Sequence, residues 1–193
     1  IQSKDKVYGT GIIHEFNERE YTVFELMVIM LIQSDNTAAN KIIDLVGMEQ
    51  INEDMVAMGL KNTKLNRKTN DERTVVSNIE NTTTAYDLAR IWKHLSNGTF
   101  LSKDNGQMLI DILRRQQIKN KLALYIPDDL KIEISSKTGD KKGVENDTEY
   151  LELPKGKFTF TVLSEGIPNS VYGAVSLAKC GKMMWDEVMN NWN

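Results

Sequence analysis

The residues of this sequence that could do chemistry stand in two short polar strings. Ser34-Asp35-Asn36 follows an apolar run, and Ser135-Ser136-Lys137-Thr138-Gly139 follows a segment that alternates like a β-strand. A lysine and a threonine at a strand edge can direct a cation and a hydroxyl to a ligand, and glycine lets that ligand approach the backbone. Such an edge suits an extended substrate with a carboxylate. Taken separately, the two strings are equally typical of a helix cap and a strand end.

Composition and charge exclude several other classes of function. The 193 residues carry 24 basic and 27 acidic side chains, for a formal net charge of -3, without the basic stripe of nucleic-acid-binding proteins. The longest apolar run, 26–32, is far shorter than the roughly 20 residues of a membrane span. His14, His94 and the single Cys180 stand alone, which gives no metal-ligand spacing. We therefore expect no metal, no nucleic acid and no membrane span.

The first polar string lies between two predicted helices. Thr22 and Glu25 have capping-box spacing, and the helix predicted over 22–32 is apolar nearly all round, which is typical of a buried helix. A second helix is expected over 37–46, where Gly47 would end it. Apolar residues at helical spacing predict two more helices, one after Thr84 and one after Ser102. The polar stretch over 60–81 predicts a long loop.

The second polar string belongs to a predicted sheet. Residues 130–135 alternate as a strand that Lys-Thr-Gly would end, and 149–153 with 158–163 predict a hairpin. A final amphipathic helix is expected from about Ser170 to Trp192. The predicted fold class is α+β, a helical lobe plus an antiparallel sheet covered by a C-terminal helix, with lobes of residues 7–129 and 130–193.

The order of the two strings on these elements resembles the class A serine β-lactamases and their penicillin-binding relatives. Further stretches look like successive landmarks of that family: Gly9-Thr-Gly11-Ile12, TVFELMVIMLIQSDNTAANKIIDLVG, NTTTAYDLARIW, LRRQQIKNKL and SSKTGD. The resemblance covers nearly the whole chain. It implies a β-lactamase/transpeptidase-like fold and a secreted or extracytoplasmic serine hydrolase. Such an enzyme opens a β-lactam through an acyl-enzyme, without metal or organic cofactor.

The resemblance also implies roles for the residues of both strings. Ser34 would relay a proton to the departing ring nitrogen and touch the substrate carboxylate. Asn36 would bind the amide side chain of the substrate, while Asp35 would only tie the turn together. Lys137 would hold positive potential over the substrate carboxylate, and Thr138 would add a hydroxyl hydrogen bond to it.

The end of the second string completes the implied site. Gly139 would leave room for the substrate, and the backbone N–H of Asp140 would serve the oxyanion hole. The negative side chain of Asp140 is unusual beside a site built for anions. We expect the substrate cleft between Ser34–Asn36 and Lys137–Gly139.

The nucleophile departs from the family pattern. The Ser-x-x-Lys of the family precedes the region that this chain resembles. Ser3 and Lys6 match its spacing, but the charged segment around them offers no apolar helix face to bury a lysine. We interpret the match as chance and expect a chain without its N-terminal nucleophile segment.

The deacylation base departs as well. Class A enzymes carry Arg-x-Glu-x-x-x-Asn in this loop, and alignment on Arg67 puts Thr69 at the Glu position and Arg73 at the Asn position. Neither residue can position a hydrolytic water, so an acyl-enzyme would hydrolyse slowly. A shifted loop could bring Glu72 in as the base. Arg67 is expected to pin the loop by pairing with an acid.

Three functions therefore remain open. The chain is a truncated β-lactamase-like hydrolase, a penicillin-binding D,D-peptidase-like protein that deacylates slowly, or a non-catalytic module that binds cell-wall peptide. The expected ligand is a β-lactam or a cell-wall peptide. If the nucleophile segment is missing, helix 22–32 exposes an apolar face that monomers seldom tolerate. We then expect a complementing N-terminal fragment, a swapped copy of the chain, or aggregation.

Overall fold

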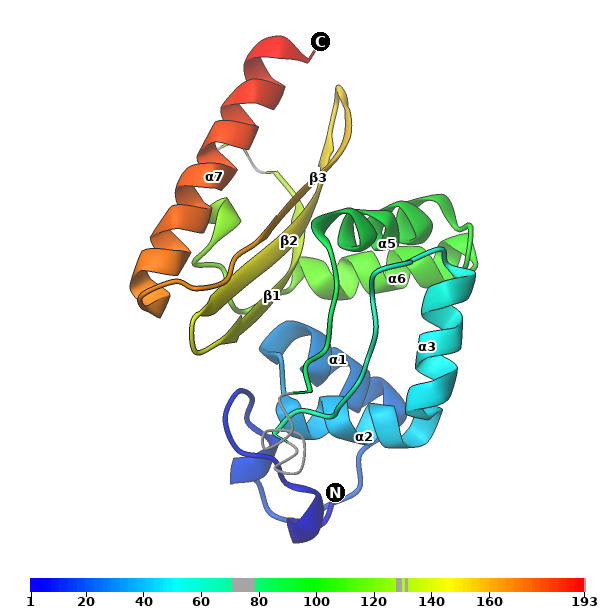
Figure 1. Ribbon diagram of the computed structural model, residues 1–193. Coiled ribbons are helices and arrows are strands. Elements are labelled where there is room, and N and C mark those ends of the chain that lie inside the picture. Colours follow the sequence, from blue (N-terminus) through cyan, green and yellow to red (C-terminus); the bar gives the residue numbers. More distant parts are fainter. Residues whose placement is uncertain (71–78, 128–129, 131, 193) are drawn as a thin grey trace. The chain divides into compact units, whose positions relative to one another are not determined.

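The computed structural model describes residues 1–70, 79–127, 130 and 132–192 (Figure 1). Six α-helices and a three-stranded antiparallel sheet make up these residues, which confirms the predicted α+β class. The elements in chain order are η1 (Ser3–Asp5), η2 (Ile13–Glu15), α1 (Val23–Gln33), α2 (Asn36–Val46), α3 (Met48–Ala57), α5 (Ala85–Asn97), α6 (Lys103–Arg114), η3 (Leu122–Tyr125), β1 (Ile134–Lys141), β2 (Val144–Leu153), β3 (Gly156–Leu163) and α7 (Ser170–Asn191).

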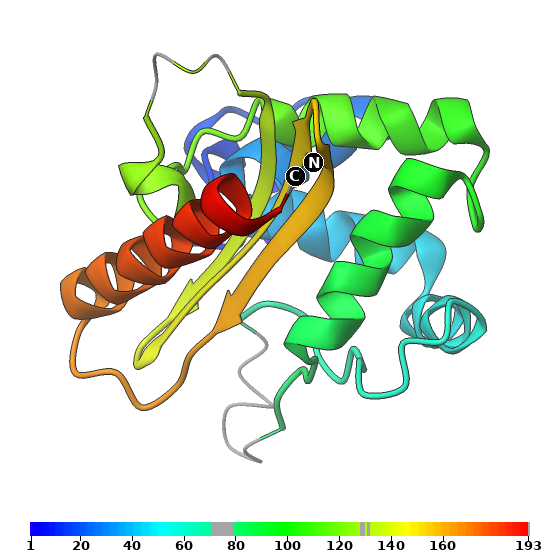
Figure 2. The same ribbon diagram turned by 90° about the horizontal axis from the view of Figure 1, so that it is seen from above.

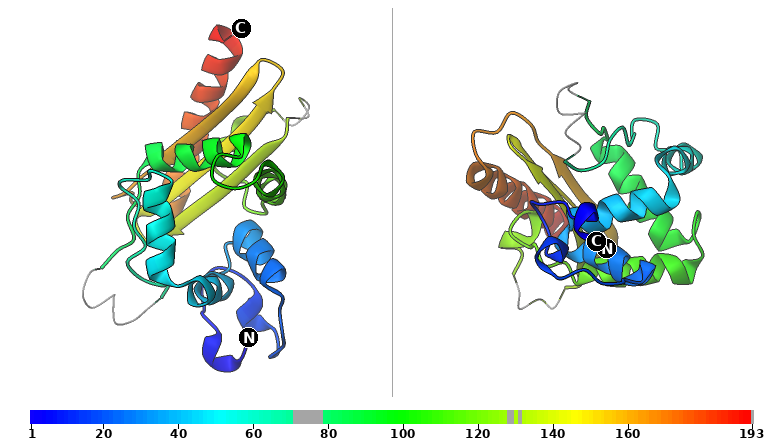
Figure 3. Two further views of the ribbon diagram at one scale, coloured as in Figure 1. Left: turned by 90° about the vertical axis from the view of Figure 1, so that its right-hand side faces the viewer. Right: turned by 90° about the horizontal axis from the view of Figure 1, so that it is seen from below.

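The chain divides into two compact units, residues 1–87 and 88–193. In the first unit, α1 and α2 pack together, and the N-terminal segment winds beside them (Figure 3). Thr22 and Glu25 form the predicted capping box of α1, with the Thr22 hydroxyl accepting the Glu25 N–H at 3.1 Å. The core of this unit gathers around three buried residues, Ile13, Leu26 and Ala38.

The predicted burial of the first helix is wrong for most of its surface. Leu26 is the one residue of α1 that is fully buried, and Val23 and Phe24 are 61% and 52% exposed. The side of α1 that packs on α2 accounts for the burial that it has.

The helix α3 was not expected from the sequence. Its apolar residues at helical spacing, Met48, Ile51 and Met55, are only half-buried. It also lacks a side-chain cap, because its N-cap residue is Gly47, which has no side chain. A helix without a Ser, Thr or Asp at its start and with a thin apolar stripe gives little signal in sequence.

The second unit is built on the sheet, whose strands lie in the order β1-β2-β3. Figure 1 and Figure 2 show α7 along one face of the sheet and α5 and α6 beside the other. Trp92 of α5 stacks on Tyr150 of β2 with ring centroids 5.7 Å apart, and Trp92 Nε1 donates to Thr148 Oγ1 at 2.8 Å. The opposite face forms an apolar core with η3 and α7: Leu122, Ile126, Leu151, Phe160, Leu177, Trp185 and Val188.

The first strand differs from its prediction at both ends. It begins at Ile134 rather than Leu130, and Glu133 reaches Arg114 at 3.1 Å instead of pairing with β2. It also continues to Lys141, where the turn through Gly143, at a φ of 78°, leads into β2. Lys137-Thr138-Gly139 therefore lies inside the strand and not at its end. The hairpin of β2 and β3 and the final helix α7 agree with their predictions.

No described helix is both long enough and apolar enough to cross a membrane.

Candidate functional site

The first polar string forms the junction between α1 and α2. Ser34 ends α1 in the left-handed region, at φ 54° and ψ 36°. That conformation costs a non-glycine residue roughly 1 kcal/mol or more, and it persists only where neighbouring contacts enforce it. Asp35 then begins α2 as its N-cap. The Ser34 hydroxyl therefore sits at a sharp turn between two helices.

Asp35 fixes this junction to the N-terminal segment. Its carboxylate is fully buried and accepts three backbone N–H groups, those of Ile12 at 2.7 Å, Ile13 at 2.9 Å and Ala38 at 2.8 Å. Gly11 lies so close that a β-carbon there would stand 2.2 Å from Asp35 Oδ2, and its φ is 108°. These contacts agree with the structural role expected for Asp35.

Asn36 is oriented by the same N-terminal segment. Its N–H donates to the Thr10 carbonyl at 3.0 Å, and its Nδ2 donates to the Tyr8 carbonyl at 3.2 Å. Asn70, which also has a φ of 54°, donates to the same Tyr8 carbonyl at 2.7 Å. Sequence reasoning missed the part played by Tyr8 and Asn70. The only signal was the neighbouring Gly9-Thr-Gly11 landmark.

The described part of the long loop is tied to α2 and to Glu80. Arg67 pairs with Glu80 at 2.8 Å, which confirms that this arginine pins the loop to an acid. Thr69 is held by Asn40, whose side chain bonds both the N–H and the carbonyl of Thr69 at 2.9 Å. Asp71, Glu72 and Arg73, including the candidate base Glu72, lie outside the described residues. The position aligned with the catalytic glutamate thus presents a threonine on a fixed backbone.

Ser3 and Lys6 both have other partners. The Ser3 hydroxyl donates to Glu18 at 2.5 Å, and Lys6 Nζ donates to the Phe16 carbonyl at 2.6 Å. Ser3 is exposed on a single 3-10 turn. A Ser-x-x-Lys nucleophile needs a hydrogen bond to its lysine, and Ser3 instead donates to the surface carboxylate of Glu18. The geometry favours the interpretation of Ser3 and Lys6 as a chance match.

The second polar string places its side chains on both faces of the sheet. Lys137 lies opposite Thr148 of β2, whereas Thr138 and Asp140 lie opposite Asp147 and Glu145. Directly opposed residues of an antiparallel pair share a face. Lys137 and Thr138 therefore start from opposite faces of β1. The hydrogen bond between Thr138 and a substrate carboxylate stays a prediction.

Lys137 is half-buried, and its Nζ donates to the Thr138 carbonyl at 2.6 Å. Burial lowers the pKa of Lys137 to about 8, although the charges of Asp140 and Asp147 act in the opposite direction. A lysine with this pKa is still roughly 90% protonated at pH 7. The side chain therefore keeps its positive charge at neutral pH and loses it in mild alkali.

The outer edge of β1 carries backbone groups that β2 does not use. The Ser136 carbonyl accepts from Gln116 Nε2 at 3.2 Å, and the Thr138 carbonyl accepts from Lys137. Backbone groups alternate between the two edges of an antiparallel strand, so the N–H of Asp140 points to this same edge. That is where the predicted oxyanion donor has to point.

Gly139 has room for a side chain. A β-carbon there would make only an ordinary contact, 3.8 Å from Asn146 Cβ. Neither backbone conformation nor internal packing therefore requires glycine at this position. The open space agrees with the expectation that glycine lets a ligand approach the strand.

A buried lysine that sequence reasoning missed supports this end of β1. Lys121, only 3% exposed, pairs with Glu145 at 2.7 Å and reaches Asp140 at 3.7 Å. Its Nζ also donates to the carbonyls of Gly139 and Asn146 at 3.4 and 3.3 Å. The Gly139 carbonyl and the Asp140 N–H belong to one peptide plane, so Lys121 holds the predicted oxyanion donor in place. It also balances the Asp140 charge. The LRRQQIKNKL landmark contains this lysine but did not reveal its role.

Two carboxyl groups on the same buried face have raised pKa values. Burial raises the pKa of Asp147 to about 6, and the Leu122 N–H and Lys121 oppose that shift. Burial and the neighbouring Asp147 raise the pKa of Glu149 well above its usual range. One oxygen of each, Asp147 Oδ1 and Glu149 Oε2, accepts no hydrogen bond from a donor group of the described residues. The pair therefore releases its protons at higher pH than exposed carboxyl groups do.

The raised pKa values of Asp147 and Glu149 predict how stability depends on pH. Between the ordinary carboxyl range and the raised pKa, the folded state binds more protons than the unfolded state, so stability falls as pH rises through that window. Glu149→Gln removes the titration. We expect the melting temperature of Glu149→Gln to exceed that of the parent by about 3 °C or more at pH 7.5, with a smaller difference at pH 4.5.

The matched control is Glu152→Gln. A hydrogen bond from Tyr150 lowers the pKa of Glu152, so this carboxylate stabilises the fold at neutral pH and its loss should lower the melting temperature there. If the two substitutions shifted the melting temperature at pH 7.5 in the same direction, the raised pKa of Glu149 would be contradicted.

The structure thus places each residue of the predicted site within its own unit. Ser34, Asp35 and Asn36 are brought together with the N-terminal segment, and Lys137, Gly139 and Asp140 with Lys121. Among the described residues no cluster of His, Cys, Asp or Glu could hold a metal ion. The available groups are a hydroxyl, an amide, a cation and a backbone donor, which suit acyl transfer.

Comparison with known proteins points to the same chemistry. The family model of the beta-lactamase enzyme family matches residues 1–188. The structure of beta-lactamase from Sphaerobacter thermophilus is 28% identical, covers 96% of this chain and 71% of that one, and has a TM-score of 0.90. PBP-A is 25% identical, with 97% and 69% of the two chains covered and a TM-score of 0.84.

A beta-lactamase from Chitinophaga pinensis shares the fold at 21% identity, with 97% and 74% of the two chains covered and a TM-score of 0.81. No curated protein matches this chain.

Proposed function

Because this chain belongs to the beta-lactamase enzyme family, we propose that it acts on the cyclic amide of a β-lactam as a serine hydrolase, outside the cytoplasm and without metal or organic cofactor. The observation that carries the proposal is the edge of β1. It combines a charged Lys137, an outward Asp140 N–H and an uncrowded Gly139. These are the groups needed to hold a substrate carboxylate and a developing oxyanion.

Each group has a step in the proposed reaction. A serine attacks the ring carbonyl, and the N–H of Asp140 stabilises the negative charge that forms on its oxygen. The C–N bond of the ring then breaks, and Ser34 passes a proton to the departing nitrogen. Asn36 binds the amide side chain of the substrate, Thr138 adds a bond to its carboxylate, and water finally hydrolyses the acyl-enzyme.

The serine that attacks is proposed to come from a segment other than the described residues. Two serines in the sequence have the Ser-x-x-Lys spacing, Ser3 and Ser176. Ser3 is engaged by Glu18, and the Ser176 hydroxyl donates to the Tyr172 carbonyl one turn earlier in α7. The exposed residues of α1, Val23 and Phe24, offer a surface that such a segment could cover. A complementing fragment or a swapped copy of the chain would serve equally. Sedimentation as a stable monomer with no bound fragment would refute this part of the proposal.

The test is binding of penicillin G to the purified chain, followed by ligand-detected NMR and by intact mass. We expect reversible binding and no mass increase, because the groups for the carboxylate are present and the attacking serine is proposed to come from another segment. Lys137→Met should weaken binding about tenfold, as expected for loss of a charge-assisted bond. For the parent, binding should also weaken from pH 7 to pH 9.5, because Lys137 loses its proton near pH 8.

The matched control is Lys142→Met, an exposed lysine in the turn of the same hairpin. It should bind as the parent does. Equal weakening by both substitutions would reduce the effect to general surface charge. A covalent penicillin adduct on this chain would place a nucleophile within it and return Ser3 to consideration.

A penicillin-binding D,D-peptidase-like function is the second candidate, and Thr69 favours it. The fixed Thr69 backbone presents no carboxylate where the family's base stands. Once the chain is joined to its serine segment, an adduct that persists for hours would support this candidate, and rapid turnover of penicillin G would support the hydrolase.

The third candidate is a non-catalytic module that holds cell-wall peptide at the edge of β1. It shares the reversible binding expected above. It is separated from both enzymes by the same joined protein, which should then bind a D-alanyl peptide and never become acylated.

A further inference from the structure

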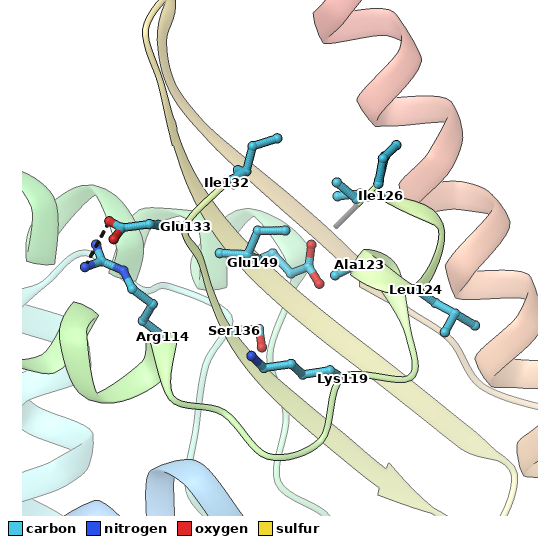
Figure 4. Close-up of a pocket in the computed structure, with 11 residues that line it drawn as sticks. Arg114, Lys119, Ala123, Leu124, Ile126, Ile132, Glu133, Ser136 and Glu149 are labelled. Carbon is cyan, nitrogen blue, oxygen red and sulfur yellow. Dashed lines mark ion pairs between the residues drawn. The ribbon is translucent and has the colours of Figure 1, made fainter. Parts of the chain in front are cut away.

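A cavity of about 490 Å³ lies within the second unit, away from the outer edge of β1 described above. It is bounded by the end of α6, by η3 and the residues after it, and by the start of β1 (Figure 4). Its apolar walls are formed by Ala123, Leu124 and Ile126 on one side and by Ile132 and Ile134 on another, and polar side chains make up nearly half of the lining. A void of this size and lining is typical of a small-molecule site.

Hydrogen-bond donors line the polar part of the cavity. Ser136 is 6% exposed, and its hydroxyl has no partner among the described residues. Lys119 lines the same cavity (Figure 4). Arg114 also lines the cavity, and its Nη1 pairs with Asp111 and Glu133, both at 3.1 Å. The side chains of Lys119 and Arg114 can only donate hydrogen bonds, and the Ser136 hydroxyl can donate one. A ligand in this part of the cavity therefore has to supply an acceptor.

The charges around the cavity favour an anion. Glu133 is already paired with Arg114, and no ion pair of Lys119 occurs within the described ranges. The remaining acid in the wall is Glu149, and burial and the neighbouring Asp147 raise its pKa well above the usual range, which favours its neutral form. A cationic ligand would meet Lys119 and Arg114, and a wholly apolar one would leave the donors of Lys119 and Ser136 without an acceptor.

We propose that this cavity binds a small organic carboxylate with a compact apolar body, its carboxylate held by Ser136, Lys119 and Arg114 and its body packed on Ile132 and Ile134. Glu149 also lines the cavity. The site is separate from the carboxylate-binding groups of Lys137 and Asp140, and it would let the protein respond to a second ligand besides its substrate.

The probe is 3-phenylpropionate, titrated into the full chain while backbone amide shifts are followed by NMR. We expect saturable shifts at millimolar concentration, as for a ligand of few atoms, located at residues 119–126 and 132–136. The equally sized 3-phenylpropanol and 3-phenylpropylamine should bind at least about fivefold more weakly, because they lack the anion.

Variants locate the carboxylate. Lys119→Ala should weaken binding of 3-phenylpropionate about two- to fivefold, the range for a pair that is partly open to solvent. Adding Ser136→Ala to Lys119→Ala should weaken the binding of 3-phenylpropionate further. Lys93→Ala is the matched control, since Lys93 is an exposed lysine of the same unit that does not line the cavity. Ile132→Phe fills the void and should abolish binding while the spectrum remains that of a folded protein.

Lys137→Met separates this site from the substrate site. It should leave the shifts at residues 119–126 unchanged, whatever it does to penicillin G. The proposal is overturned if the probe does not bind, if the alcohol and the amine bind equally well, or if Lys119→Ala matches Lys93→Ala. Loss of binding in Lys137→Met with retention in Lys119→Ala would assign the probe to β1 instead.

Discussion

Lys121→Met should lower the free energy of unfolding by about 3–5 kcal/mol, the cost of leaving one member of a buried ion pair without its partner. Glu145, 4% exposed, would lose its ion-pair partner, and the carbonyls of Gly139 and Asn146 would lose a donor. Urea denaturation at pH 7 measures the change. The substitution should also disturb the Asp140 N–H, whose peptide plane Lys121 holds.

Two further variants make this expectation specific. Lys182→Met removes an exposed helical pair with Asp186 and should cost less than about 0.5 kcal/mol. Lys121→Met combined with Glu145→Gln removes both buried charges and should recover part of the loss. A Lys121→Met variant as stable as Lys182→Met would show that the ion pair adds nothing to the fold.

Asp35→Ala should lower the free energy of unfolding by about 3 kcal/mol. Three backbone N–H groups lose their acceptor, two of them on the buried residues Ile13 and Ala38, and α2 loses its N-cap. Thermal and urea unfolding followed by circular dichroism measure the change. Asp35→Asn keeps one acceptor oxygen and should lose about half as much.

Asp44→Ala is the control for Asp35→Ala. Asp44 lies on the same helix and pairs with Lys68, but its side chain is about half exposed, so its loss should cost less than about 1 kcal/mol. Similar costs at the two positions would contradict the view that Asp35 ties the Ser34–Asn36 junction to the N-terminal segment. In that case, the Asp35→Ala variant would be expected to bind penicillin G as tightly as the parent does.

Local signals explain why much of the fold could be predicted from sequence. Thr22 with Glu25, Ser102 before α6 and Thr84 before α5 are caps whose partners lie within three residues, and each cap is present. Helix α3 escaped prediction because its start offers no such cap. The start of β1 was misplaced because Glu133 pairs with Arg114, a partner far away in the sequence.

The buried acids of β2 show the limit of pattern reasoning. Glu145, Asp147 and Glu149 alternate along the strand, which in sequence indicates a face toward solvent. All three are buried, because Lys121 brings a cation and η3 brings backbone N–H groups to them. Neither contribution is visible at the strand itself. Burial of this face is decided by residues more than twenty positions away.

The candidate site divides in the same way. The sequence supplied Ser34, Asn36, Lys137 and Asp140 through a family resemblance, and the family itself is now shown. It did not supply Tyr8, Asn70 or Lys121, which orient those residues through backbone carbonyls. Such contacts place few demands on residue type, so they leave no recognisable string in the sequence.

The outer edge of β1 has a further consequence for colloidal behaviour. An unpaired edge strand can template intermolecular sheet growth, and proteins protect such edges by occupying their backbone groups or by placing charge on them. Here the side chains of Gln116 and Lys137 already bond two outward carbonyls, and Lys137 adds charge. The lysine proposed to receive a substrate thus also guards the protein against polymerising through its own sheet.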